Sequence, residues 1–106
     1  KRYIEAEQWL RKAAEQGDKI AQAQLGNLYF NGMGVPRNLE EAAYWTRKSA
    51  EQGYAIAQTM LGFQYHDGLG LPQDYKQAAH WLQKAADQGL ALAQKRIGIM
   101  YLHGYG

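Results

Sequence analysis

The sequence contains no cysteine, only two prolines and a single serine. Without cysteine there can be no disulfide bonds and no thiolate metal sites, although the redox compartment stays undetermined. No apolar run approaches the ~18 residues of a membrane span, and no segment has the pattern of a signal peptide. We therefore expect no membrane insertion of this segment.

The sequence also lacks a charge excess, because 12 basic residues are scattered among 10 acidic ones and the formal net charge is +2. A nucleic-acid-binding domain normally shows a clustered basic stripe, so the charge pattern predicts no nucleic-acid partner. Hydrophobic residues make up 46% of the chain and charged residues 21%. This composition predicts a folded chain, and 106 residues suffice for at most one ordinary domain.

What the sequence does contain is a repeat: Trp9, Trp45 and Trp81 are each separated by 36 residues. A fixed period of this length is typical of stacked small units, none of which can bury its apolar face alone. We expect a half repeat at 1–17, full repeats at 18–53 and 54–89, and a half repeat at 90–106. Because the chain starts inside a repeat and stops in a loop, we also expect it to be part of a longer protein. The same step is kept by Gly17, Gly53 and Gly89, by Gly26, Gly62 and Gly98, by Tyr29, Tyr65 and Tyr101, and by Gly32, Gly68 and Gly104.

Each repeat is predicted to form two helices joined by a glycine-rich connector, and the two connectors contain the prolines, Pro36 and Pro72. Glycine at the C-terminal end of a helix favours the left-handed conformation that ends it, and proline prevents continuation. Asn38 and Asp74 are followed three residues later by Glu41 and Gln77, which resembles a capping box. The pattern predicts six helices and no strands: first helices at 18–31, 54–67 and 90–103, and second helices at 2–16, 38–52 and 74–88.

Comparison of the copies separates two faces of the first helix. One face keeps Ala21, Gln22, Leu25, Gly26 and Tyr29 nearly unchanged in the other copies, so it is expected to pack against partner helices. The opposite face varies, which means that the scaffold does not demand its identities. The varying face also includes positions 23 and 24 and their counterparts in the other copies. Ten residues of this face, which we call the variable strip, are Asn27, Phe30, Asn31, Met60, Phe63, His66, Asp67, Lys95, Ile99 and Leu102.

The variable strip is the predicted partner-binding surface, because it holds more hydrophobic side chains than a solvated face needs. The alternative is that Phe30, Phe63 and Leu102 complete the packing between neighbouring repeats. The three tryptophans are predicted to lie in or near the core, since aromatic residues at helical spacing usually pack.

Catalytic and cofactor chemistry finds little support. The Gly-x-Gly segments follow a helix and precede proline, whereas phosphate-binding loops follow a strand and precede a helix. Ser49 replaces an alanine of the other copies and lacks a Gly-x-Ser-x-Gly context. A zinc site built from His66, His103 and Asp67 is the one metal alternative, and two surface histidines are the simpler interpretation. We predict no enzyme, no cofactor and no metal.

The repeated residues resemble the Sel-1-like repeat (SLR) family, a relative of the tetratricopeptide repeat. The resemblance implies a right-handed α-solenoid of antiparallel helix pairs whose concave face is made by first helices. It also implies an adaptor for a protein or peptide, often in exported or envelope-linked bacterial proteins. In the second full repeat the matching residues are Ala57, Leu61, Gly62, Tyr65, Gly68, Gly70, Pro72, Ala78, Trp81, Lys84, Ala86, Gln88 and Gly89.

We therefore predict a protein–protein interaction scaffold that binds its partner along the concave face of the first helices. An alternative role is architectural: a spacer, or a module that associates with itself through its open repeat ends. A hydrolase is the third alternative, and the sequence offers it no nucleophile and base.

Overall fold

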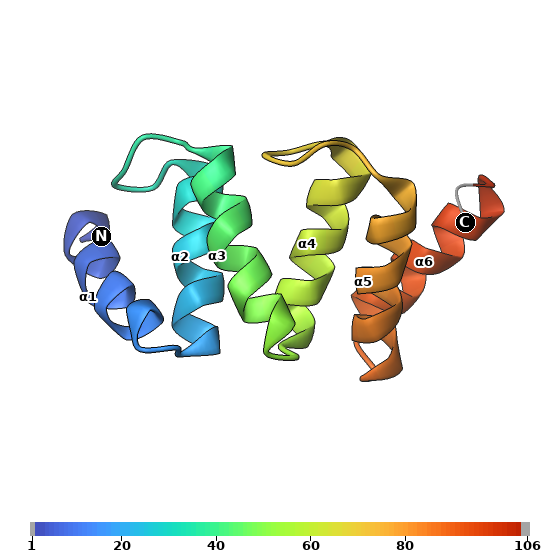
Figure 1. Ribbon diagram of the computed structural model, residues 1–106, viewed down its shortest axis with the longest axis horizontal. Helices are drawn as coiled ribbons and strands as arrows, with labels where there is room; N and C mark the ends of the chain where they lie inside the picture. The colour runs from blue at the N-terminus through green and yellow to red at the C-terminus, as the bar shows by residue number, and fades with distance from the viewer. Residues whose placement is uncertain (1, 105–106) are drawn as a thin grey trace.

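The protein, described here from a computed structural model for residues 2–104, is an extended row of six helices with principal dimensions of 42 × 24 × 21 Å (Figure 1). Lys1, Tyr105 and Gly106, which belong to the two predicted half repeats, lie outside the described residues. Within them there are helices and turns and no strands, which confirms the predicted all-α class. The helices are α1 (Tyr3–Glu15), α2 (Lys19–Asn31), α3 (Leu39–Glu51), α4 (Ala55–Asp67), α5 (Tyr75–Asp87) and α6 (Ala91–Leu102).

The helices begin and end where the local sequence predicts. Gly32 and Gly68 end α2 and α4 in the left-handed conformation, with φ of 67° and 69°. The carboxamide of Asn38 accepts a hydrogen bond from the backbone N–H of Glu41 at 3.1 Å. The carboxylate of Asp74 accepts one from Gln77 at the same distance. These two side chains are therefore true N-caps.

The capping boxes are incomplete, because the backbone N–H of each cap residue is already used elsewhere. Asn38 donates its N–H to the carbonyl of Tyr29 at 2.9 Å, and Asp74 donates to Tyr65 at 2.9 Å. The connector turns the chain back so that the start of the second helix lies beside the last turn of the first. There it satisfies a carbonyl that would otherwise be unpaired.

Each helix packs against its neighbours in sequence, most extensively in the pairs α2–α3 and α4–α5. The recurring glycine of the first helix lies at these crossings. A Cβ added to Gly26 would lie 2.6 Å from Thr46 Oγ1, and one added to Gly62 would lie 2.6 Å from Leu82 Cγ. Close packing of the second helix against this point of the first therefore explains these two glycines. Gly98 in α6 is different, since nothing lies within 4 Å of such a Cβ.

The second glycine of each connector allows a contact that the sequence did not predict. Gly34 and Gly70 have φ of 76° and 80°. A Cβ on Gly34 would overlap Tyr3 at the start of α1, and a Cβ on Gly70 would overlap the carbonyl of Leu39 at the start of α3. Each connector thus lies directly on the second helix that precedes its own repeat, and glycine permits both the bend and the approach.

The tryptophans do not share one environment. Trp45 and Trp81 are buried, with 5% and 8% of their surface exposed, and Trp45 packs against the apolar residues of α1 and α2. Trp9 occupies the same repeat position but is 69% exposed, so the prediction of three core tryptophans is wrong for Trp9. The reason is positional. Trp45 packs against the two helices that precede α3, namely α1 and α2, whereas no helix precedes α1 in the described chain.

A hydrogen-bonded group joins α1 to α2. Arg11 Nε donates to Glu7 Oε2 at 2.9 Å, and the hydroxyl of Tyr29 donates to the same carboxylate oxygen at 3.0 Å. Arg11 also donates to the Tyr29 oxygen. Burial, and after it the hydrogen bond to Glu7, raises the pKa of Tyr29. For Arg11, burial lowers the pKa, but the hydrogen bonds to Glu7 and Tyr29 outweigh it and the net shift is upward.

The two helices of one repeat, such as α2 and α3, form a hairpin. Glutamines that recur in the repeat connect one hairpin to the next. Gln58 is buried, and its Nε2 donates to the carbonyl of Ala50 at 3.3 Å. Its Oε1 accepts from Gln88 Nε2 at 2.9 Å, and Gln88 also donates to the Gly53 carbonyl at 2.8 Å. Gln22 and Gln52 make the same set of bonds one repeat earlier. The recurrence of these glutamines is thus explained by bonding between helices.

We expect Gln58→Ala to lower the free energy of unfolding by about 1–3 kcal/mol, because it removes the side-chain bond to the Ala50 carbonyl and the acceptor of the Gln88 amide. Urea unfolding followed by circular dichroism measures this loss. Gln24→Ala is the matched control, since Gln24 is exposed on the same type of helix. Equal, small losses in the two variants would show that the glutamine bonds do not hold the repeats together.

Candidate functional site

The recurring face of the first helices is buried in the two copies that have neighbours on both sides. Ala21, Leu25, Ala57 and Leu61 are each 5% exposed or less. In α6, which ends the row, Ile97 is buried while Tyr101 is 58% exposed. The face that recurs between copies therefore serves packing, as predicted.

The opposite face is more deeply involved in packing than expected at one position. Ala23 and Thr59 are equivalent residues of the varying face, yet only 5% and 2% of their surface is exposed. Ala23 belongs to the core cluster that extends to α4, and the hydroxyl of Thr59 donates to the Ala55 carbonyl at 3.0 Å. The next hairpin covers this edge of the helix, so these two positions are not part of a free surface.

The ten residues of the variable strip lie outside the core. Phe30, Met60, Phe63 and His66 are half-buried, and the other six are exposed. Phe63 also packs against the larger core cluster, so its role in packing between repeats is real, and its exposed part remains available. The exposed members are Asn27, Asn31, Asp67, Lys95, Ile99 and Leu102.

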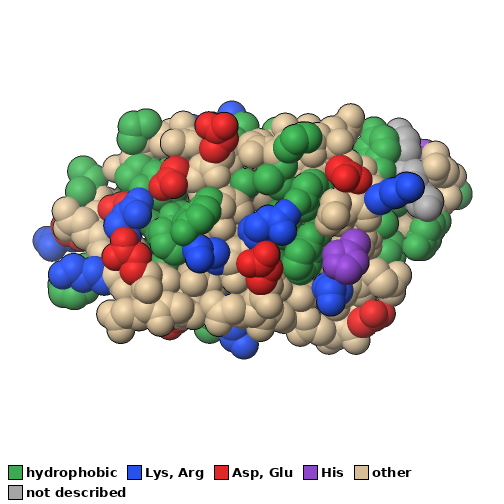
Figure 2. All heavy atoms as spheres, viewed as in Figure 1, with side chains coloured by type: hydrophobic (Ala, Val, Ile, Leu, Met, Phe, Trp, Pro, Cys, Tyr) green, Lys and Arg blue, Asp and Glu red, His purple; other side chains and the backbone are tan. Residues whose placement is uncertain are grey.

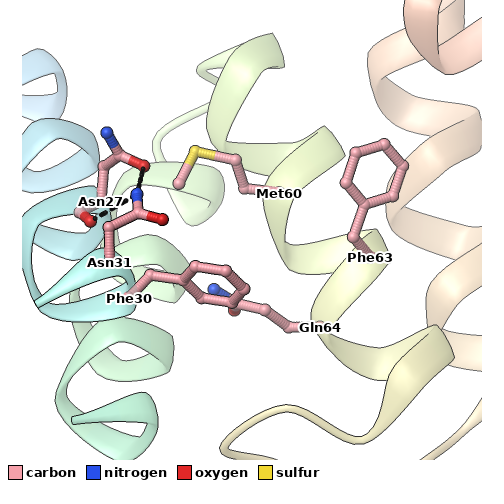
Figure 3. A pocket seen from close by; sticks show the side chains of 6 residues that line it. All are labelled: Asn27, Phe30, Asn31, Met60, Phe63 and Gln64. Carbon is pink, nitrogen blue, oxygen red and sulfur yellow. Dashed lines mark hydrogen bonds between the residues drawn. The ribbon is translucent and has the colours of Figure 1, made fainter. Parts of the chain in front are cut away.

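Five of these residues surround one pocket between α2 and α4, which we call the central pocket (Figure 3). Its volume is about 180 Å³. In α2, Asn31 Nδ2 donates to the side chain of Asn27 at 2.8 Å, so the two amides form one polar edge. Apolar side chains from both helices and the amide of Gln64 form the rest of the wall. The lining residues are Asn27, Phe30, Asn31, Met60, Phe63 and Gln64.

Gln64 is the lining residue that sequence reasoning missed. It is 2% exposed, its Nε2 lies 3.4 Å from Thr46 Oγ1, and its Oε1 has no hydrogen-bond partner within the described residues. Leu28 and Met100 occupy the same repeat position, and both are buried. The signal was a polar residue at a position that is apolar in the other two copies. Burial of an amide oxygen without a hydrogen bond lowers the stability of the fold, so packing alone does not explain a glutamine at this position.

A guanidinium lies over each of the two phenylalanine rings of the central pocket. The Arg37 Cζ is 5.5 Å from the centre of the Phe30 ring, and Arg37 Nε donates to the Phe30 carbonyl at 2.8 Å. The Arg96 Cζ is 4.7 Å from the centre of the Phe63 ring. Cation–π attraction of this kind holds the two arginines at the rim.

The surface continues on both sides of the central pocket. A shallower hollow of about 340 Å³ shares Asn27 and Met60 with it. On α6, a hollow of about 160 Å³ is lined by Leu92, Lys95, Arg96 and Ile99. Because Phe63 and Arg96 are in contact, the α6 hollow adjoins the central pocket, and Lys95 and Ile99 extend the strip.

Three predicted residues lie apart from the pockets. Leu102 is 81% exposed near the end of α6 and lines none of the hollows described above. His66 and Asp67 also belong to the strip and line none of these hollows, and His66 Nδ1 is 2.8 Å from Asp67 Oδ1. The structure thus brings seven of the ten predicted residues to the central pocket and the α6 hollow, and the other three line neither.

Ser49 and the histidines are the residues that the sequence analysis weighed for catalysis or metal binding. Ser49 is completely buried, and its hydroxyl donates to the Lys19 carbonyl at 2.6 Å. In the described part of the chain, no three histidine, aspartate or glutamate side chains come together as metal ligands. Among residues 2–104, none of the helices has the length and apolar character to cross a membrane.

Comparison with known proteins identifies the repeats. The model of the Sel1 repeat family matches residues 2–18, 19–54, 55–90 and 91–106. A search of curated protein sequences found no match. Solved structures do match: a Sel1 repeat protein from Oxalobacter formigenes is 42% identical, with a TM-score of 0.92 over 97% of this chain.

Two further solved structures are similar. A protective antigen of uropathogenic Escherichia coli with an SLR fold is 45% identical over 92% of this chain, with a TM-score of 0.89. Cysteine-rich protein B of Helicobacter pylori is 29% identical over 84% of this chain, with a TM-score of 0.80. This chain covers 21% of the E. coli protein, 42% of the O. formigenes protein and 67% of the H. pylori protein.

Proposed function

Because the chain belongs to the Sel1 repeat family, whose members are generally protein-interaction scaffolds, we propose that it binds a protein or peptide partner along its first helices. The partner lies on the side formed by α2, α4 and α6, with an apolar side chain in the central pocket. The repeat units supply a rigid support, and the residues that vary between units supply the recognition. The role needs no cofactor and no catalytic group.

The central pocket is the observation that carries this proposal. Phe30, Met60 and Phe63 are half-buried side chains that leave a hollow open to solvent between two helices. Interfaces draw most of their binding energy from a few apolar or aromatic groups in such hollows, surrounded by polar groups. The amides of Asn27 and Asn31 are exposed at its edge and can bond to a peptide backbone.

An architectural role is the second function with an observation behind it. Trp9 is 69% exposed on α1, and Tyr101 is 58% exposed on α6 next to the open site of Gly98. A second copy could place its α1 on α6 as α3 lies on α2, which would produce head-to-tail assembly. In that case the variable strip would have no ligand of its own.

We expect the double substitution Phe30→Ala and Phe63→Ala to reduce binding of selected peptides at least ~30-fold, since loss of two anchors costs about 2 kcal/mol or more. The measurement selects binders from a displayed random-peptide library with the wild-type chain. It then compares their dissociation constants for the wild-type and double-variant chains. Under the architectural role, the same substitutions change stability alone.

Tyr44→Ala is the control for this experiment, because Tyr44 is 52% exposed on the second helix α3. A second variant, Asn27→Trp, fills the pocket edge from an exposed position without removing any packed ring. Peptides that bind both variants as well as the wild type, or that lose affinity equally with Tyr44→Ala, would contradict the proposed site.

A further inference from the structure

We infer that the partner of the variable strip is an acidic protein segment, which inserts one apolar side chain into the central pocket and pairs flanking carboxylates with Arg37, Arg96 and Lys95. The inference rests on the proposed function and specifies the chemistry of its ligand. Three observations support it: the pairing of the arginines, the division of charge between the two types of helix, and the geometry of the rim.

The five arginines of the chain fall into two groups. Arg2, Arg11 and Arg47 lie at or within second helices, and each has a glutamate within 4.0 Å. Arg37 and Arg96 lie at the variable strip, and neither forms an ion pair with a carboxylate of the described residues. The strip therefore presents two guanidinium groups whose charge the protein itself does not neutralise.

The formal charges divide in the same way. Residues 1–17, 38–53 and 74–89, which hold the second helices, contain eight basic and eight acidic residues. Residues 18–37, 54–73 and 90–106, which hold the first helices and the connectors, contain four basic and two acidic residues. The entire excess of +2 thus belongs to the segments that hold the first helices and the connectors, which include Arg37, Lys95 and Arg96.

The face formed by the second helices carries charged side chains of both signs. In Figure 1, α3 passes in front of α2 and α5 in front of α6. Figure 2 shows the molecule from that same direction, and there Lys and Arg side chains are interspersed with Asp and Glu. Charge-balanced surfaces of this kind attract neither sign strongly, so long-range attraction of an acidic partner would favour the opposite face.

The acidic groups on the first-helix side are already engaged. Asp18 caps α2, where its carboxylate accepts a hydrogen bond from the Ala21 N–H at 3.0 Å. Asp67 lies 2.8 Å from His66 Nδ1. Neither carboxylate forms an ion pair with Arg37 or Arg96, so both guanidinium groups remain available to the carboxylates of a partner.

The rim arginines are also held in place. Arg37 is fixed by its bond to the Phe30 carbonyl and by the Phe30 ring, and Arg96 is fixed over the Phe63 ring. A guanidinium that is already ordered loses less side-chain entropy when it pairs with a carboxylate, and its remaining N–H groups match a carboxylate in a planar fork. The same two rings border the central pocket, so an apolar anchor and its acidic flanks would be bound side by side.

An acidic peptide fits this arrangement better than a nucleic acid. Binding of a phosphate backbone draws on a continuous track of cations and on ring faces that are open for base stacking. Here the cations are few, and one guanidinium already lies over each phenylalanine ring. The pocket between Phe30, Met60 and Phe63 instead suits an aliphatic or aromatic side chain of a peptide.

The test uses one displayed library of random peptides against three forms of the chain. The first is the wild type, the second is Lys95→Glu with Arg96→Glu, and the third is the matched control Lys48→Glu with Lys76→Glu. The control makes the same change of net charge on second helices, at two exposed lysines. Binders are sequenced, and their affinities are measured by fluorescence anisotropy at low and high NaCl and in competition with single-stranded RNA.

We expect wild-type binders to be enriched in Asp and Glu around an apolar residue, and to weaken ~10-fold with the strip reversal and less than ~3-fold with the control. Their affinity should also fall as NaCl is raised, since rim pairs are screened. The strip reversal should select basic peptides instead. Enrichment of acidic residues and this switch together would support the proposal.

Other outcomes overturn it in distinguishable ways. Peptides that depend on Phe30 and Phe63 but show no acidic preference would leave the proposed function intact and remove the inference about charge. Peptides that bind without Phe30 and Phe63 would remove both. Tight RNA binding that displaces the peptides and is lost with the strip reversal would assign the arginines to a nucleic acid.

Discussion

Replacement of Trp45 by alanine is expected to lower the free energy of unfolding by about 3–5 kcal/mol, the usual cost of truncating a buried tryptophan. Trp45 packs against Ala14 of α1 and against Leu25 and Leu28 of α2, so it joins one hairpin to the one before it. Its indole N–H has no hydrogen-bond partner among the described residues, and the loss is therefore one of packing. Urea unfolding followed by circular dichroism gives the value.

Trp9→Ala is the matched control, because Trp9 occupies the same repeat position and is 69% exposed. We expect it to change stability by about 0.5 kcal/mol or less, as is usual for surface residues. A domain of this size is stable by roughly 5–15 kcal/mol, so Trp45→Ala can leave little folded protein. In that event Trp45→Leu, which keeps part of the apolar volume, supplies the measurement. Equal effects at Trp9 and Trp45 would contradict the proposed packing.

A second large effect is expected for Gly70→Ala, which should cost about 2–5 kcal/mol, from backbone strain at positive φ together with steric overlap. Gly70 has φ of 80°, and an added Cβ would overlap the Leu39 carbonyl at the start of α3. The connector between α4 and α5 would have to move away from the preceding hairpin. Thermal and urea unfolding measure the loss.

Gly53→Ala separates the two causes. Gly53 has φ of 91°, but nothing lies within 4 Å of an added Cβ. Its substitution should therefore cost only the conformational term, about 1–2 kcal/mol. The difference between the variants isolates the contact of the connector with α3. If the two glycines gave the same loss, that contact would contribute nothing to stability.

The two tests address one property of a repeat array. Trp45 and Gly70 both act between hairpins, where the stability of such an array depends on each neighbouring pair. The central pocket lies between the first helices of two adjacent repeats, α2 and α4, so it exists only while those repeats keep their spacing. Variants that loosen the spacing should therefore weaken partner binding as well as folding.

The sequence by itself determined the period, the six helices, the side-chain caps at Asn38 and Asp74, and the face by which the first helices pack. These features depend on residues close together along the chain, and three copies of the pattern are present for comparison. The variable strip was also defined in this way, but variation between copies does not by itself mean exposure, because Ala23 and Thr59 vary and are buried. The absence of cysteine likewise excluded disulfide bonds and thiolate metal sites by composition alone.

The tertiary structure alone decided how deeply each copy of a position is buried. Trp9 and Trp45, or Gly98 and Gly26, are identical in repeat position and differ in their surroundings. Burial depends on whether another hairpin lies alongside, and that is a long-range property which a periodic pattern does not encode. For the same reason only the structure placed Gln64 at the pocket, and Arg37 and Arg96 over the rings of Phe30 and Phe63.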